Sequence, residues 1–452
     1  MKKFFQWLNQ RKVFRDLNPQ EFSWVLYDVG NSAYTMLACS LIPIWLKALA
    51  VREIAEDVAA EGFLTQKAAT GTYSLVIAIV TVIIALLGPV LGAFADRKDK
   101  KKIFFTTTVA IGVIGCLINS VAWSWLLFLV VYTITKVAYQ ASLTFYDSML
   151  NDVTTEERMD EVSSYGYAWG YIGSCIPFLV ALVAYILSGG LSENLMLFSP
   201  LVGKIIGFGI TAVWWLLVTI PLIKNYKQAN YVENVEHHSV GDVFKGILKT
   251  LKKIAVEDKK VLFFLIAFFL YIDGVGTIID NCINIGTALG LNTVGQVVFL
   301  LATQVVAWGG SLVFAALSKK HKTVPLILVC IIGYFCVCIY ALWLKQLYQF
   351  AILAFGVGCF QGSIQSLSRS YYSKIIPPEN SGEYFGIYDI FAKGASFLGS
   401  ALISVVMFIP GGNINIAVAS LSAFFLLGFI FLIISSKQKT LNRKPAEGAI
   451  EE

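Results

Sequence analysis

Long apolar runs separated by short polar segments repeat along almost the whole chain. A helix needs roughly 20 apolar residues to cross the hydrocarbon core of a bilayer, and twelve segments approach or exceed this length. We expect spans at about 24–47, 71–95, 103–121, 123–146, 164–188, 203–222, 261–284, 293–317, 324–343, 347–372, 383–408 and 413–435. The pattern predicts an all-α integral membrane protein with twelve transmembrane helices.

A polar, basic stretch divides these spans six and six. The predicted organisation is an N-terminal segment (1–23), a six-helix bundle (24–223), a linker (224–260), a second six-helix bundle (261–436) and a tail (437–452). Within the linker, "VFKGILKTLKKI" alternates apolar and basic residues at helical spacing, which predicts one amphipathic helix at the membrane surface.

The two halves resemble each other in sequence. "GPVLGAFADRKDK" starts at Gly88 after the second span, and "GSLVFAALSKKHK" starts at Gly310 after the eighth. They align without a gap, glycine on glycine and basic cluster on basic cluster. The repeat predicts two pseudo-symmetric six-helix bundles.

Composition and charge agree with a membrane protein. Only 14% of the residues are charged and 57% are hydrophobic, whereas about 25% of a soluble domain is charged. The net charge of +6 comes from residues between apolar runs, so it indicates membrane orientation and no nucleic-acid partner. With both termini cytoplasmic, 27 of the 35 Lys and Arg residues lie inside and five outside. This bias predicts a multi-pass protein of the cell membrane with cytoplasmic termini.

Motifs for cofactor or metal chemistry do not occur in the sequence. The chain has no CxxC, no GxxxxGK[ST] nucleotide loop and no HExxH zinc motif. The eight cysteines lie in or beside apolar segments, where buried thiols are the usual interpretation. We therefore expect no metal, no cofactor and no enzymatic activity.

The loop after the second span carries a recognisable signature. "GAFADRKDKKK" (92–102) resembles the loop motif of the Major Facilitator Superfamily, in which a glycine and an aspartate precede a basic cluster. Asp96, Arg97 and Lys101 hold the matching positions. The second copy departs from the motif, because Ser318 stands where the aspartate would be.

Four further stretches resemble the vacuole effluxer family, the autophagy-linked (Atg22-like) transporters and their bacterial relatives. They are "WVLYDVGNSAY" (24–34), "FYDSMLND" (145–152), "SSYGYAWGYIGS" (163–174) and "GSIQSLSRSYYSKIIPPENSGEYFGIYDIFAKGAS" (362–396). The resemblance implies a twelve-helix carrier in which spans 1, 4, 7 and 10 line a central cavity. It also implies amino-acid efflux, which is reported for eukaryotic members.

Two charges within spans are the first candidates for a binding site. Asp273 interrupts the apolar run of span 7, roughly 18 Å from its cytoplasmic end by helical rise, and Lys136 lies at similar depth in span 4. A charge inside a membrane is costly and needs a partner or a wet cavity. One interpretation is that the pair binds a zwitterion, with its carboxylate on Lys136 and its ammonium on Asp273. The other is a structural role, in which the two pair with each other or Asp273 bonds backbone freed near Gly274 and Gly276.

Polar faces on spans 1 and 10 complete the predicted substrate site. Asp28 and Asn31 share one face of span 1, and Gln361 and Gln365 share one face of span 10. Asp28 lies close to the cytoplasmic end, so an interfacial bond is the alternative to a binding role. Asp273, Asp28 and Asp389 are also candidates for carrying a proton, because burial raises the affinity of a carboxylate for protons.

A third group of charges is predicted to control conformation. The resemblance to the superfamily implies that Asp96 and Arg97 in the loop, and Asp147 at the end of span 4, belong to a charge network at the cytoplasmic side; simple surface pairing is the alternative. Arg369 near the end of span 10 is interpreted as a gate or structural residue, and bidentate binding of an anionic group is the alternative. Lys393 is expected to pair with Asp389 four residues earlier, the favourable orientation in a helix.

These features predict a monomeric secondary transporter in the lipid bilayer. It would move a small polar organic solute, amino acids first, with efflux favoured and proton coupling open. The alternatives are the same fold carrying a sugar, a drug-like cation or a lipid. A non-transporting sensor or a membrane enzyme is disfavoured, because the linker is too short for a folded soluble domain and no catalytic constellation is visible.

Overall fold

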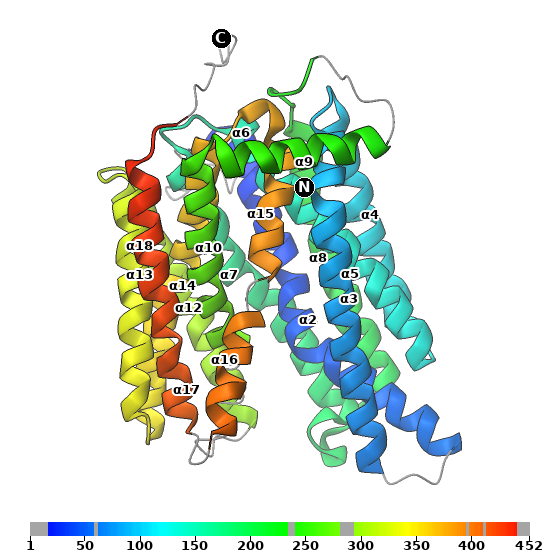
Figure 1. Cartoon of the computed structure of the whole chain (residues 1–452). Coiled ribbons are helices and arrows are strands. Elements are labelled where there is room, and N and C mark those ends of the chain that lie inside the picture. Colours follow the sequence, from blue (N-terminus) through cyan, green and yellow to red (C-terminus); the bar gives the residue numbers. More distant parts are fainter. Residues whose placement is uncertain are drawn as a thin grey trace. The chain divides into compact units, whose positions relative to one another are not determined.

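The computed structural model describes residues 17–57, 62–233, 240–280, 293–394, 397–409 and 413–440 (Figure 1). Among them, ten helices are long and apolar enough to cross a membrane. Two shorter apolar helices, Ile79–Ala95 and Leu398–Phe408, lie within the expected spans 71–95 and 383–408. The predicted fold class, an all-α membrane protein of twelve spans, is confirmed.

The helices follow the apolar runs of the sequence. In the N-terminal half they are α2 (Pro19–Asp57), α3 (Gly62–Ala95), α4 (Lys100–Val121), α5 (Trp125–Ser148), α6 (Leu150–Val153), α7 (Met159–Tyr185) and α8 (Pro200–Asn225). After these come α9 (Val240–Val256), α10 (Lys259–Asp280), α12 (Thr293–Ser318), α13 (Thr323–Tyr340), α14 (Leu347–Ile375), α15 (Ser381–Gly394), α16 (Phe397–Phe408), α17 (Ile414–Ser420) and α18 (Ser422–Lys437).

Local sequence signals mark where several helices begin. Asn18 accepts hydrogen bonds from the backbone of Gln20 and Glu21, and the Glu21 carboxylate accepts one from the Asn18 backbone N–H in return. This reciprocal capping satisfies N–H groups that have no acceptor within the helix. α8 begins at Pro200, whose missing N–H costs nothing in the first turn of a helix.

The chain divides into two compact units. Unit 1 comprises Met1–Leu86, Lys102–Tyr146 and Trp169–Tyr226, and unit 2 comprises Leu87–Lys101, Asp147–Ala168 and Lys227–Glu452. Two segments of the N-terminal sequence half, Leu87–Lys101 and Asp147–Ala168, therefore belong to the unit built mainly from the C-terminal half.

Unit 1 is packed around aromatic side chains of α2 and α8. The ring of Tyr34 stacks on Trp215 with centroids 5.7 Å apart, and both side chains are fully buried. Gly30 lets the two helices approach closely, since a Cβ there would lie 2.5 Å from Val218 Cγ2. Small residues at helix contacts are typical of membrane bundles.

Unit 2 has its core between α10, α13, α15 and α18. Phe268 stacks on Tyr388 at 4.1 Å, and Tyr334 stacks on Phe425 at 5.2 Å. A Cβ at Gly274 would lie 2.7 Å from the Phe425 ring. The glycine in span 7 thus admits a bulky ring from α18 against the α10 backbone.

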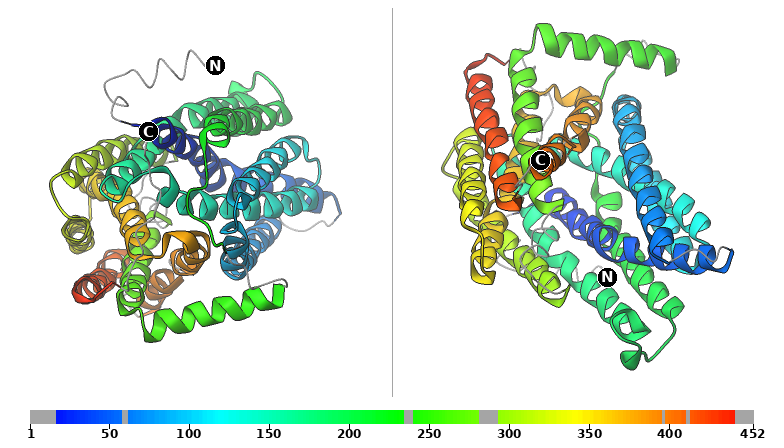
Figure 2. Two further views of the ribbon diagram at one scale, coloured as in Figure 1. Left: turned by 90° about the horizontal axis from the view of Figure 1, so that it is seen from above. Right: turned by 60° about the horizontal axis from the view of Figure 1, so that its bottom comes forward.

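The amphipathic helix expected in the linker is present as α9. It lies crosswise to α10, which follows it directly in the chain (Figures 1 and 2). Val243 and Ile247 of α9 are buried against Val90 of α3, with Phe94 packed beside them. All of these residues belong to unit 2.

Candidate functional site

Asp273, the acid within the apolar span, bonds the backbone of another helix of unit 2. Its Oδ1 accepts hydrogen bonds from the Gly399 N–H of α16 at 3.0 Å and from the Thr277 hydroxyl at 3.3 Å. The side chain is fully buried. Glycine at 399 permits this approach, because a Cβ there would lie 2.1 Å from Thr277 Oγ1 and the threonine would have to shift. One carboxylate oxygen of Asp273 therefore joins α10 to α16.

Asp273 accepts a hydrogen bond from a backbone N–H, as the structural interpretation of this residue predicts, but the donor lies elsewhere in the chain. The sequence pointed to backbone near Gly274 and Gly276, on the same helix, whereas the donor is Gly399, 126 residues away. Lys136 belongs to unit 1 and Asp273 to unit 2. A shared substrate between them stays a prediction.

In unit 1, α2 and α5 place polar groups side by side. The Tyr27 hydroxyl bonds Ser142 at 2.8 Å, and the Thr35 hydroxyl bonds that of Tyr139. The partly buried Lys136 places its Nζ 5.6 Å from the centre of the Tyr139 ring. A cation over an aromatic face is stabilised by the ring quadrupole. The two helices therefore present hydroxyls and one ammonium group within a largely aromatic surrounding.

Asp28 and Asn31, the predicted polar face of span 1, contact each other. The Asn31 amide donates to Asp28 Oδ1 at 3.1 Å and to the Tyr27 carbonyl at 3.3 Å, and both side chains are buried. α7 approaches this turn through Gly170, where a Cβ would lie 2.8 Å from Ser32 Oγ. Gly170 thus allows close packing of α7 against α2.

On α14, the predicted polar face makes contacts of different kinds. Gln365 donates to the Gln361 carbonyl within the helix at 3.0 Å. Ser368 bonds the Tyr271 hydroxyl of α10 at 2.6 Å. Gln361 is buried, whereas Gln365 is partly exposed. Of the two glutamines, Gln365 therefore has the more accessible side chain.

Arg369 is the centre of a buried charge cluster in unit 2. Its Nη1 lies 2.9 Å from Asp147 Oδ1, its Nε donates to Ser163 Oγ at 3.0 Å, and its Nη2 donates to the Ser163 carbonyl at 3.1 Å. The Tyr167 ring lies 4.6 Å from the guanidinium carbon. We call Arg369, Asp147 and Ser163 the Arg369 cluster. The rigid, planar guanidinium group of Arg369 joins α14 to the ends of α5 and α7. A lysine side chain cannot reproduce this geometry.

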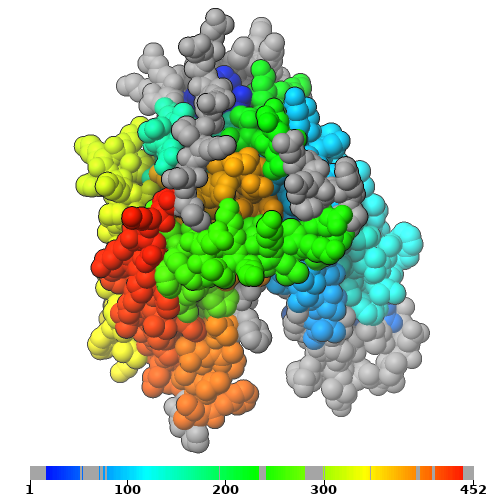
Figure 3. All heavy atoms as spheres, turned by 45° about the horizontal axis from the view of Figure 1, so that its top comes forward, coloured from blue at the N-terminus to red at the C-terminus, as the bar shows by residue number. Residues whose placement is uncertain are grey.

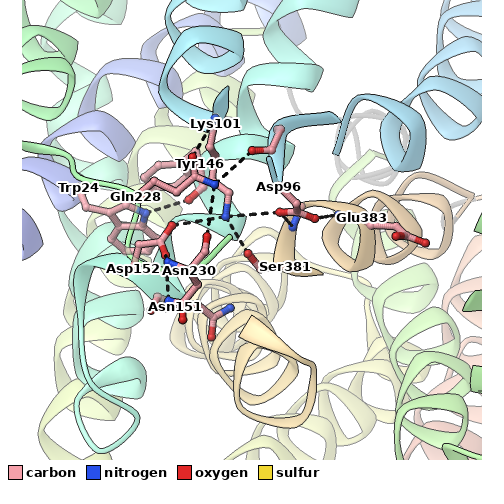
Figure 4. A network of polar contacts seen from close by, with 12 residues as sticks. Trp24, Asp96, Lys101, Tyr146, Asn151, Asp152, Gln228, Asn230, Ser381 and Glu383 are labelled. Carbon is pink, nitrogen blue, oxygen red and sulfur yellow. Dashed lines mark hydrogen bonds and ion pairs between the residues drawn. The ribbon is translucent and has the colours of Figure 1, made fainter. Parts of the chain in front are cut away.

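Asp96 lies against the first turn of α15 (Figure 4). Its Oδ1 accepts from the Gly382 N–H at 2.8 Å and its Oδ2 from the Glu383 N–H at 2.9 Å. The carboxylate thereby satisfies two N–H groups that have no acceptor within the helix, and it lies at the positive end of the helix dipole. Gly92 and Gly382 make this approach possible, since a Cβ at Gly92 would lie 2.1 Å from the Gly382 carbonyl oxygen.

Lys101 bridges two acids beside the same helix end (Figure 4). Its Nζ lies 3.6 Å from Asp96, 3.4 Å from Asp152 and 2.8 Å from the Ser381 hydroxyl. We call Asp96, Lys101, Asp152 and Ser381 the Asp96 network. Burial raises the pKa of Asp96 to about 6, although Lys101 and the two backbone N–H groups oppose this. Desolvation therefore outweighs the favourable contacts of the carboxylate.

A further buried acid, Asp160, was missed by the sequence analysis. It accepts hydrogen bonds from Ser370 and Thr323 at 2.6 Å each and pairs with Lys374 at 2.7 Å. Its signal was the series of serines on α14, at 363, 366, 368, 370 and 373, all of them fully buried. Hydroxyls repeated in a buried helix require partners, and Asp160 is one of them.

Three predicted residues remain, of which two have described side chains. The Arg97 guanidinium lies over the Phe94 ring at 4.7 Å, and Asp389 is buried on α15. The side chain of Lys393 lies outside the described residues, so its pairing with Asp389 stays a prediction. Among the described residues, no group of three His, Cys, Asp or Glu side chains could hold a metal ion.

Comparisons with known proteins agree on one family and one fold. A family model described as "Vacuole effluxer Atg22 like" matches residues 19–444. The chain is 38% identical to the uncharacterized MFS-type transporter YxiO of Bacillus subtilis, over 93% of this chain and 95% of that protein. It is 27% identical to the autophagy-related protein 22-1 of Sclerotinia sclerotiorum, over 55% of this chain and 45% of that protein.

Solved structures with the same fold include two transporters of the Major Facilitator Superfamily. The human organic anion transporter MFSD10 (TETRAN) matches with a TM-score of 0.68 at 12% identity, covering 91% of this chain and 97% of its own. The proton:xylose symporter XylE matches with a TM-score of 0.69 at 11% identity, over 92% of this chain and 95% of its own. Identities this low establish the fold alone.

Proposed function

We propose that this chain, which belongs to the Atg22-like vacuole effluxer family of MFS-type transporters, exports small polar organic solutes, amino acids first among them. The description of the family as effluxers supports the direction. The excess of Lys and Arg on one side of the spans supports a cell-membrane location with cytoplasmic termini. We further propose that the carrier works as a monomer.

The substrate site of this proposal combines polar residues of the cavity-lining spans. Lys136 binds the carboxylate of an amino acid, and Asp273 receives its ammonium group. Asp28, Asn31, Gln361 and Gln365 supply the surrounding hydrogen bonds. The partial burial of Lys136 beside Tyr139 supports its role, because a cation held on an aromatic ring keeps an anchored position near the apolar interior.

Gating in this proposal rests on the Asp96 network and the Arg369 cluster. Each joins a segment of the N-terminal sequence half to a helix of the C-terminal half, and all members lie in unit 2. Opening the cytoplasmic side separates these partners, and closing it restores them. Alternating access of this kind needs interactions that differ between the two states. Arg97, Asp389 and Lys393 are proposed to take part in the same switching.

Proton coupling is proposed to involve Asp273, with Asp28 and Asp389 as the other candidates. A carboxylate that exchanges its partners during transport changes its proton affinity. Flux measured in liposomes with and without a pH gradient tests the coupling. If the flux rate is independent of the gradient, the carrier does not couple transport to protons.

A ligand screen by thermal unfolding tests the substrate class. A substrate that binds only the folded chain raises the unfolding temperature, by an amount that grows with the logarithm of its concentration over Kd. We expect stabilisation by amino acids, loss of this shift in Lys136→Gln, and its retention in Lys204→Gln. Lys204 is a matched control, because it is a buried lysine of unit 1 that contacts the Ala122 carbonyl and the Phe128 ring. Stabilisation by sugars, drug-like cations or lipids instead would replace amino acids as the substrate class.

A further inference from the structure

The helix α9 exposes a face that neither the fold nor the proposed transport site uses. Val243, Ile247 and Ile254 form its buried stripe. Phe244 and Leu248, four residues apart and on one adjacent face, are 45% and 65% exposed. Large apolar side chains paired on an exposed face indicate an interaction surface.

Next to this apolar stripe runs a stripe of positive charge. Lys245, Lys249 and Lys252 follow each other at spacings of four and three residues, which places them on one side of a helix. All three are exposed, and none contacts an acid within the described part of the chain. Going round α9, the order is therefore the buried stripe, the exposed apolar stripe and the lysine stripe.

The position of α9 relative to α10 places it at the membrane surface. α10, which starts at Lys259 three residues after α9 ends, is one of the candidate membrane spans. α9 runs crosswise to α10 in two different views (Figures 1 and 2), and the space-filling view shows it as a green band along the surface (Figure 3). A helix perpendicular to a span, at the end of that span, lies in the plane of the membrane surface.

From this geometry we infer that α9 is a lipid-binding helix that docks on anionic headgroups of the adjacent leaflet. Phe244 and Leu248 insert at the boundary of the acyl chains, and Lys245, Lys249 and Lys252 bind the phosphates. A basic amphipathic helix with an apolar face is suited to an anionic interface. Electrostatic attraction of this kind strengthens binding roughly fivefold per lysine near the surface.

Lipid binding at α9 has a consequence for the rest of unit 2. The buried stripe of α9 packs against Val90 and Phe94 of α3, and the segment from Leu87 to Lys101 also carries Asp96. A lipid that holds α9 in place therefore also holds the backbone that leads into the Asp96 network.

Amide hydrogen exchange of the full-length chain tests the inference. The chain is placed, one copy per nanodisc, in phosphatidylcholine or in phosphatidylcholine with one part in three phosphatidylglycerol. We expect amides of residues 240–256 to exchange at least tenfold more slowly in the anionic lipid, and less so at high salt. Equal exchange in the two lipids would overturn the inference.

Matched variants separate α9 from general charge effects. Lys245→Gln, Lys249→Gln and Lys252→Gln together should abolish the lipid-dependent slowing, while an unchanged unfolding temperature in detergent shows that the fold is kept. The control combines Lys320→Gln, Lys322→Gln and Lys437→Gln, which are exposed lysines outside α9, and it should keep the slowing. Loss of the effect in the control would refute a specific role of α9.

Two further experiments identify what α9 binds. Inorganic phosphate added to phosphatidylcholine nanodiscs should leave the exchange unchanged, and slowing by phosphate would show a site for a free anion in place of a lipid surface. Phe244→Ser with Leu248→Ser should accelerate exchange in both lipids, because insertion is lost. If the exchange of this variant equals that of the wild type, the apolar stripe does not insert.

Discussion

Asp273 Oδ1 accepts a hydrogen bond from the Gly399 N–H at 3.0 Å, across 126 residues of sequence. Asp273 is fully buried within a candidate membrane span, and in the hydrocarbon core of a membrane no water is available to accept from such a backbone N–H. The acid in the apolar span therefore has a structural task, whether or not it also binds a substrate.

Substitution of Asp273 separates these two roles. Asp273→Asn keeps an oxygen acceptor for Gly399 and should lower stability little, whereas Asp273→Ala should cost about 1–3 kcal/mol, as for a buried donor that loses its acceptor. Thermal unfolding of both variants measures this difference. Transport then decides the second role: a folded Asp273→Asn that transports at the wild-type rate has only the structural task.

Because Gly92 and Gly382 approach closely, we expect a single methyl group added at residue 92 to lower the free energy of unfolding strongly. In Gly92→Ala the new Cβ would meet the Gly382 carbonyl oxygen at 2.1 Å, so backbone has to move, at a cost of about 3 kcal/mol or more. Gly209→Ala on α8 is the control, because a Cβ there meets nothing within 4 Å. The control should be neutral or gain up to about 1 kcal/mol from helix propensity. Equal unfolding temperatures for the two variants would contradict the observed packing.

The pairing of Arg369 with Asp147 predicts strong coupling. Arg369→Gln leaves a partly buried Asp147, which is 18% exposed, and should cost about 3–5 kcal/mol. The double variant with Asp147→Asn should be more stable than the sum of the two single effects predicts.

A second ion pair, of which only the lysine is exposed, serves as the comparison for this double-variant measurement. Lys319 and Glu161 lie 2.8 Å apart, with side chains 45% and 8% exposed, so water screens the lysine and their coupling should be weaker than that of Arg369 with Asp147. Denaturation of each single and double variant supplies both coupling energies. Additive effects at Arg369 and Asp147 would show that the pair contributes nothing specific.

Asp96 predicts a dependence of stability on pH. Its pKa of about 6 in the folded chain lies above the ordinary value of about 3.9, so folding takes up a proton. The raised pKa of Asp96 contributes up to roughly 3 kcal/mol to the free energy of unfolding. This contribution is fully present below pH about 4 and is lost as the pH rises through about 6.

Unfolding temperatures between pH 4.5 and 7.5 test this sign. Asp96→Asn should lack the fall in stability around pH 6 that the wild type shows. Asp99→Asn is the matched control, an exposed acid in the same loop, and it should keep the fall. An unchanged pH profile in Asp96→Asn would assign the dependence to another group.

Sequence alone determined the spans, the family resemblance and the amphipathic α9. These features are local: a run of about 20 apolar residues suffices for a span, and the spacing of lysines and apolar residues suffices for α9. These features do not depend on which helices become neighbours in the folded chain.

Only the tertiary structure decided the partners of the buried charges. Asp273 bonds Gly399, Arg369 bonds Asp147 across 222 residues, and Asp160 bonds Ser370 across 210. The sequence shows that a buried charge needs a partner, because desolvation makes an unpaired one costly. It does not show which partner, because that is set by how distant helices pack, and glycines such as Gly382 and Gly399 permit contacts that hydropathy does not encode.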